Sequence, residues 1–106
     1  MALAERHSDL VLNRETLARI CAHYGVRRLE VFGSAAKGEL REGSDVDLLV
    51  QFARRDDMGP ADQYFGLKEA LEELFGRPVD LLTEGAVRNR YLRMAIEQER
   101  KLLYAA

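Results

Sequence analysis

The sequence predicts a small α/β domain in which helices pack on a mixed sheet of three to four strands. Short runs rich in valine, leucine and phenylalanine alternate with longer stretches whose apolar residues recur at helical spacing. Such alternation favours a sheet covered by helices. The chain has 106 residues, 47% of them hydrophobic and 32% charged, which is typical of one globular domain. We therefore expect a single domain over 1–106.

The first predicted helix covers about 14–24. Asn13 suits its N-cap, and Gly25 stands where a helix end favours a residue that tolerates positive φ. The residues before Asn13 are mixed in character and predict either loose order or a short helical turn. The apolar positions of the helix fall on one face: Leu17, Ile20, Cys21 and Tyr24. On this face Cys21 is expected to be a packed small hydrophobe rather than a nucleophile.

The remaining elements follow from apolar runs and turn residues. Pro60 suits the first turn of a helix that closes at Gly76. The predicted order is a strand over 27–32, a helical turn over 35–38, a loop over 39–44, a strand over 46–52, a loop over 53–61, a helix up to 75, a strand over 78–82 and a helix from about Ala86. Residues 101–104 either continue this helix or form a short edge strand, and we favour the strand. Strand directions stay open.

Composition excludes several classes of protein. A formal net charge of −2, from 16 basic and 18 acidic residues, argues against a basic nucleic-acid scaffold, so no stable nucleic-acid binding is expected. The single cysteine permits neither an internal disulfide nor a cysteine-based zinc cluster. The first residues carry charges throughout and predict no secretory signal, and no apolar run is long enough to span a bilayer. We expect a cytoplasmic protein without a membrane role.

Gly33 and Ser34 come directly after the first predicted strand and open the helical turn. Such a corner leaves backbone N–H groups free, and glycine lets a phosphate approach them closely. The Ser34 hydroxyl could add a further donor to a phosphate oxygen. Because glycine–serine is a common turn pair, these two residues alone favour a structural interpretation.

Asp45 and Asp47 begin the most strand-like run of the chain. Residues two apart on a strand project from the same face, so two like charges are set side by side. Mg²⁺ is often held by one or two carboxylates together with substrate phosphates, and such a pair fits it. Alternatively, Asp45 caps the loop and Asp47 lies at a solvated strand mouth. The metal interpretation is favoured because the opposite face is apolar: Val46, Leu48, Val50 and Phe52.

Asp80 interrupts the short apolar run over 79–82. If this strand lies beside the strand over 46–52, Asp80 joins Asp45 and Asp47 on one face. The alternative is an aspartate at a strand end, bonded to a neighbouring loop. Three convergent carboxylates are rarely structural, so we favour a shared site.

Gly33-Ser34, then ten residues, Asp45-x-Asp47 and a later aspartate resemble the signature of the polymerase-β-type nucleotidyltransferase superfamily. The short chain is similar to the minimal nucleotidyltransferase (MNT) group. The resemblance implies a nucleotidyltransferase fold and Mg²⁺-dependent transfer of AMP from ATP to a hydroxyl. It implies that Asp45 and Asp47 hold Mg²⁺, that Asp80 completes a second metal position or takes the proton of the hydroxyl, and that Gly33 and Ser34 grip the phosphates.

Lys37 departs from the arginine that the family often carries at this position. Lysine neutralises a phosphate but cannot make the bidentate contact of arginine, so Lys37 is either a nucleotide-binding residue or a solvated charge at a helix end.

The resemblance also implies a partner. MNT proteins of this kind are antitoxins encoded with a HEPN-domain ribonuclease toxin, which they inactivate by adenylylating a tyrosine, so a hetero-oligomer is expected. Segments 53–61 and 84–93 could dock it, although a solvated helix face is the preferred interpretation of Arg88, Arg90 and Arg93. The alternatives are a small-molecule or RNA acceptor, or a module that binds nucleotide or partner without turnover.

Overall fold

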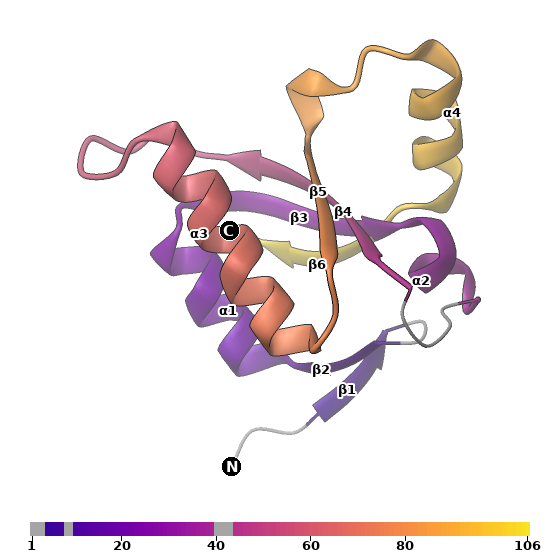
Figure 1. Ribbon diagram of the computed structural model, residues 1–106, viewed down its shortest axis with the longest axis horizontal. Helices are drawn as coiled ribbons and strands as arrows, with labels where there is room; N and C mark the ends of the chain where they lie inside the picture. Colours follow the sequence, from indigo (N-terminus) through magenta and orange to yellow (C-terminus); the bar gives the residue numbers. More distant parts are fainter. Residues whose placement is uncertain (1–3, 8–9, 40–43) are drawn as a thin grey trace.

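The structure is a computed structural model that describes residues 4–7, 10–39 and 44–106. These residues contain a four-stranded sheet with the order β5-β4-β3-β6 and a separate two-stranded hairpin. The sheet strands are β3 (Val26–Phe32), β4 (Val46–Phe52), β5 (Val79–Thr83) and β6 (Lys101–Ala105). Helices lie against this sheet (Figure 1). The predicted fold class is confirmed, and the chain from 101 onward is the edge strand that was favoured over a longer helix.

The sheet is mixed, which settles the strand directions that the sequence left open. β3 runs antiparallel to both β4 and β6, whereas β4 and β5 are parallel. Parallel neighbours need a crossover connection, and α3 (Pro60–Phe75) supplies it. As a result, the beginnings of β4 and β5 lie at the same end of the sheet as the end of β3.

The helices predicted over about 14–24 and from Pro60 to 75 form as expected. α1 (Arg14–His23) is capped by Asn13, whose side chain accepts a hydrogen bond from the N–H of Thr16 at 3.0 Å. Pro60 opens α3, and Gly76 follows it with φ +67°. The left-handed conformation of Gly76 gives this helix the glycine end that the sequence predicted.

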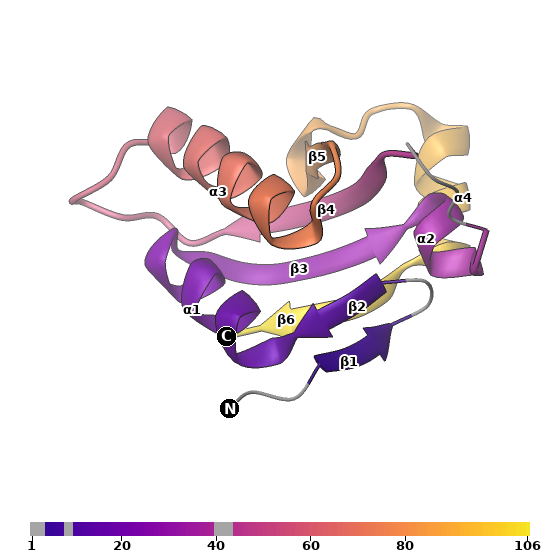
Figure 2. The same cartoon turned by 60° about the horizontal axis from the view of Figure 1, so that its bottom comes forward.

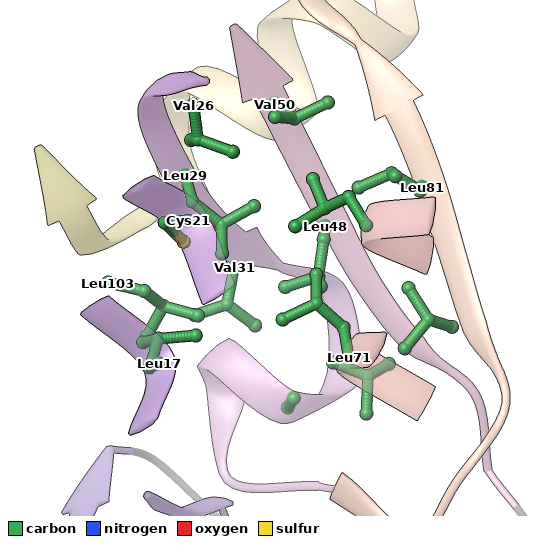
Figure 3. Close-up of a cluster of buried hydrophobic side chains, with 14 of the residues drawn as sticks. Leu17, Cys21, Val26, Leu29, Val31, Leu48, Val50, Leu71, Leu81 and Leu103 are labelled. Atoms are coloured by element: carbon green, nitrogen blue, oxygen red, sulfur yellow. The ribbon is translucent and has the colours of Figure 1, made fainter. Parts of the chain in front are cut away.

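α1 and α3 cover one face of the sheet, as Figures 1 and 2 show. The core between them is apolar, and Cys21 lies fully buried within it, as predicted (Figure 3). Burial raises the pKa of the Cys21 thiol to about 12, so the thiol stays protonated at neutral pH. The side chains drawn and labelled in this core are Leu17, Cys21, Val26, Leu29, Val31, Leu48, Val50, Leu71, Leu81 and Leu103.

The opposite face of the sheet packs against the last helix, α4 (Arg90–Glu99). Here the sequence prediction was wrong about where the helix begins. Residues 84–86 form a short 3₁₀ turn, η1 (Glu84–Ala86), and the helix starts only after Asn89, whose side chain accepts from the N–H groups of Tyr91 and Leu92. The buried residues of this second core are Phe32, Leu49, Val87 and Ile96.

Of the residues before Asn13, the described ones, 4–7 and 10–12, lie in strands instead of the loose order or short helical turn that the sequence predicted. β1 (Ala4–His7) and β2 (Leu10–Asn13) pair antiparallel, with His7 opposite Leu10. Isolated two-stranded hairpins are marginal in water, and contacts of β2 with α1 and α3 supply the missing support. Of the predicted loop over 39–44, residues 40–43 lie outside the described part. Among the described residues, no helix has both the length and the apolar character needed to cross a membrane.

Candidate active site

The three predicted carboxylates gather where β4 and β5 begin. Asp47 is the second residue of β4 and Asp80 the second residue of β5, and the parallel register places them directly opposite each other. Both point to the face that carries α4, because Leu49 and Leu82, two residues further along each strand, pack in that second core. Asp45 lies just before β4 and is exposed. The structure therefore provides the strand pairing on which the shared site depends.

Asp47 occupies the most confined of these three positions. It is half-buried, whereas Asp45 and Asp80 are exposed. Burial raises the pKa of the Asp47 carboxyl, and the negative charges of Asp80, Asp45 and Glu99 raise it further. The site therefore concentrates negative charge that a bound cation would offset.

Gly33 stands beside Asp47 at the end of β3. Phe32, the last residue of that strand, is the register partner of Asp47. Gly33 has φ +69°, and a Cβ atom added to it would collide with the Asp47 carboxylate. Glycine is thus required here both by the backbone conformation and by the space that Asp47 takes.

Ser34 and Lys37 are carried by α2 (Gly33–Lys37), the short helix that opens at Gly33. Ser34 is half-buried in the first turn. Lys37, in the last turn, forms an ion pair with Glu99, with 2.8 Å between Nζ and Oε1. This hydrogen-bonded carboxylate raises the pKa of Lys37. Lys37 therefore has a specific partner in addition to its contact with solvent.

Glu99 is a residue of this site that sequence reasoning missed. It is the last residue of α4, and its Oε2 atom accepts a hydrogen bond from the Gly33 N–H at 3.3 Å. A carboxylate in the last turn of a helix opposes the helix dipole, which makes it an unfavourable place for an acid unless it has partners. That misplaced charge was the signal available in the sequence, but only the fold brings it to Gly33.

The carboxylates fit a hard divalent cation by their chemistry, since all are oxygen donors on one end of one sheet face. Within 4–7, 10–39 and 44–106, however, no cluster of three or more histidine, cysteine, aspartate or glutamate side chains is arranged to hold a metal ion by itself. Mg²⁺ commonly takes one or two carboxylates and completes its shell with phosphates and water. Asp45 and Asp47, with Asp80 opposite Asp47, have the chemistry for such a shared arrangement rather than for a closed protein cage.

Comparison with known proteins identifies the family. The sequence model described as "Nucleotidyltransferase domain" matches residues 14–103. A relative named protein adenylyltransferase MntA, from Thermococcus cleftensis, is 32% identical over 98 residues, which cover 92% of this chain and 93% of the relative.

Solved structures agree with this match. One, described as a candidate minimal nucleotidyltransferase, is 40% identical, has a TM-score of 0.66 and covers 83% of this chain and 86% of its own. A second, of a tri-AMPylated Shewanella oneidensis HEPN toxin in complex with MNT antitoxin, shares the fold with a TM-score of 0.58. It is 16% identical and covers 88% of this chain and 70% of its own.

Proposed function

The chain belongs to the nucleotidyltransferase domain family, and from this premise we propose that it transfers AMP from ATP to a hydroxyl group of a protein. The name of the Thermococcus cleftensis relative, a protein adenylyltransferase that aligns with nearly the whole chain, supports this choice of reaction. The observation that carries the proposal is the placement of Asp47 opposite Asp80 and against Gly33. A nucleotide bound there would need carboxylates to hold its cation and a backbone that its phosphates can approach closely.

The reaction forms a bond between the acceptor oxygen and the α-phosphorus of ATP. The bond from that phosphorus to the oxygen bridging to the β-phosphate breaks, pyrophosphate leaves, and the acceptor hydroxyl loses its proton. Catalysis requires in-line positioning of the hydroxyl and neutralisation of the charge on the phosphates. When bound, Mg²⁺ would supply that neutralising charge.

We assign the residues of this site as follows. Asp45 and Asp47 would hold the cation, and Asp80 would either complete a second metal position or accept the proton of the hydroxyl. Asp80 is exposed at the sheet edge, so an incoming acceptor can reach it. The Gly33 N–H and the Ser34 hydroxyl would donate to phosphate oxygens, with Lys37 adding positive charge next to them.

For the acceptor we propose a tyrosine of a HEPN-type toxin, with this chain as its antitoxin in a hetero-oligomer. Support comes from the Shewanella oneidensis complex, in which an AMPylated HEPN toxin is bound to a chain of this fold. In the present chain, α4 leaves Tyr91 81% and Met94 55% exposed, and Arg88 and Arg90 beside them are exposed as well. This mixed apolar and basic surface is where we place the partner.

The test is labelling with ATP that carries radioactive phosphorus at the α-position. The full chain and Mg²⁺ are incubated with and without the product of the neighbouring gene, and the labelled residue is found by mass spectrometry. We expect label on a tyrosine of the partner. Label on RNA or on a small molecule would contradict the proposed protein acceptor. ATP binding without pyrophosphate release would contradict the proposed transfer reaction.

Aspartate variants test the site itself. Asp45→Asn and Asp47→Asn are each expected to reduce labelling on the order of a thousandfold, because charge stabilisation by a metal ion contributes several kcal/mol. Glu69→Gln is the control, since it removes one carboxylate charge from an exposed position on α3, outside the candidate site and outside both segments that could dock the partner. Full activity in the Asp45→Asn/Asp47→Asn double variant would refute the assignment.

A further inference from the structure

Glu99 joins two elements at the candidate site. Its Oε2 atom accepts from the Gly33 N–H at 3.3 Å, and its Oε1 atom lies 2.8 Å from Lys37 Nζ. One carboxylate thus binds the first residue and the last residue of α2 at the same time. The Glu99 side chain is only 23% exposed, so this arrangement is partly shielded from water.

The two donors that Glu99 takes are those assigned above to phosphate. A backbone N–H and a lysine ammonium are typical donors to phosphate oxygens, and charge-assisted bonds of this kind are the stronger ones. A carboxylate presents two negatively charged oxygens, as a phosphate does. In the structure, Glu99 therefore contacts both donors that the proposed function assigns to phosphate.

The Gly33 N–H is a single donor, so a phosphate that binds it would have to take the place of Glu99 there. Glu99 contacts the N–H of Gly33, the residue that lies against the Asp47 carboxylate, and a triphosphate would add several negative charges to the same surroundings. The helix dipole of α4 also disfavours a negative charge in the last turn. Phosphate and Glu99 therefore compete for Gly33 and Lys37.

With the proposed function as its basis, we propose that Glu99 competes with the nucleotide for the same donors. The Glu99 side chain then releases Gly33 and Lys37 before a nucleotide phosphate binds. The backbone at this point stays anchored, because the next residue, Arg100, is held by the carboxylates of Glu30 at 3.1 Å and Glu84 at 3.2 Å. Release is thus a rotation of the Glu99 side chain. The consequence is a lower affinity for ATP than the same donors would give if they were free.

The experiment measures binding of ATP–Mg²⁺, and separately of inorganic pyrophosphate, to the full chain by calorimetry. Glu99→Gln is expected to bind both about tenfold more tightly, the gain that follows when a blocked state populated at about nine in ten is removed. Glu97→Gln is the matched control. It removes the same charge from the same last turn of α4, but Glu97 is 63% exposed and pairs with Arg100 instead.

A second pair of variants separates competition from a general effect of charge. Lys37→Met should weaken pyrophosphate binding, and Glu99→Gln should gain much less in the Lys37→Met background because one of the two blocked donors is gone. Thermal unfolding checks that each variant is folded.

Several results would overturn the inference. Weaker binding by Glu99→Gln would make Glu99 a ligand rather than a competitor, and equal effects of Glu99→Gln and Glu97→Gln would leave only a structural ion pair. No binding by wild type and Glu99→Gln alike would also contradict it. Because binding needs no acceptor protein, failure of AMP transfer with tighter binding intact would count against the proposed function alone.

Discussion

At the residue scale, Asp47 has a role in the proposed chemistry, but its charge lowers the stability of the folded protein when no cation is bound. Its carboxyl is half-buried and lies opposite Asp80. Burial raises its pKa, and the charges of Asp80, Asp45 and Glu99 raise it further. The folded state therefore holds the Asp47 proton more tightly than the unfolded state does. It follows that the contribution of Asp47 to stability falls as pH rises above 3.8, its ordinary pKa.

Asp47→Asn should therefore stabilise the metal-free protein at pH 7, because the amide is neutral and of similar shape, while it strongly reduces the proposed transfer. We expect a higher midpoint of thermal unfolding than in wild type, with a difference that shrinks as pH is lowered below about 4. Calorimetry across this pH range measures it, with Asp56→Asn as the exposed control. A lower midpoint at pH 7 would show that the Asp47 charge supports the fold instead.

At the scale of elements, α4 positions Glu99 and is the helix that the sequence predicted least well. The predicted start at Ala86 fails because residues 84–86 form a separate 3₁₀ turn. The helix begins instead where Asn89 can cap it, with its side chain 2.9 Å from the Tyr91 N–H and 3.1 Å from the Leu92 N–H. Ile96 is the only buried residue of this helix, so the helix packs on the sheet through a small contact area.

Asn89→Ala should lower the free energy of unfolding by about 1 kcal/mol, the usual effect of losing a capping side chain. Urea denaturation measures this change. Asn89→Ser is the matched control, since serine restores an acceptor for the same N–H groups and should retain most of the stability. A loss in Asn89→Ala that is no larger than in Asn89→Ser would mean that the cap contributes little to α4.

At the scale of the whole molecule, a network of ion pairs around the buried Glu30 ties the α4 side to the sheet. Glu30, on the central strand β3, is 3% exposed and pairs with Arg28 at 3.0 Å and Arg100 at 3.1 Å. Arg100 also reaches Glu84, in η1, at 3.2 Å. One guanidinium thus links β3, η1 and the junction of α4 with β6.

Arg100→Ala should destabilise the protein by about 2 kcal/mol, because it leaves the buried Glu30 carboxylate with fewer partners. The usual loss for a broken buried pair, about 3–5 kcal/mol, is reduced here since Arg28 still contacts Glu30. Chemical denaturation measures it. The exposed Arg54→Ala should change stability by less than about 0.5 kcal/mol.

The double variant Glu30→Met/Arg100→Met should show strong coupling: it should lose less stability than Glu30→Met and Arg100→Met lose in sum. Additive losses would contradict a network centred on this pair.

By itself, the sequence determined the parts of this protein that depend on local patterns: the alternation of strands and helices, the cap at Asn13, the helix starting at Pro60, and the motif from Gly33 to Asp47. These follow from periodicity and backbone preferences within a few residues. Long-range packing sets the β1–β2 hairpin, the start of α4, the parallel pairing that places Asp80 opposite Asp47, and the approach of Glu99 to Gly33. Each of these depends on contacts between segments far apart in the chain, and no local pattern encodes which strand becomes the neighbour of which.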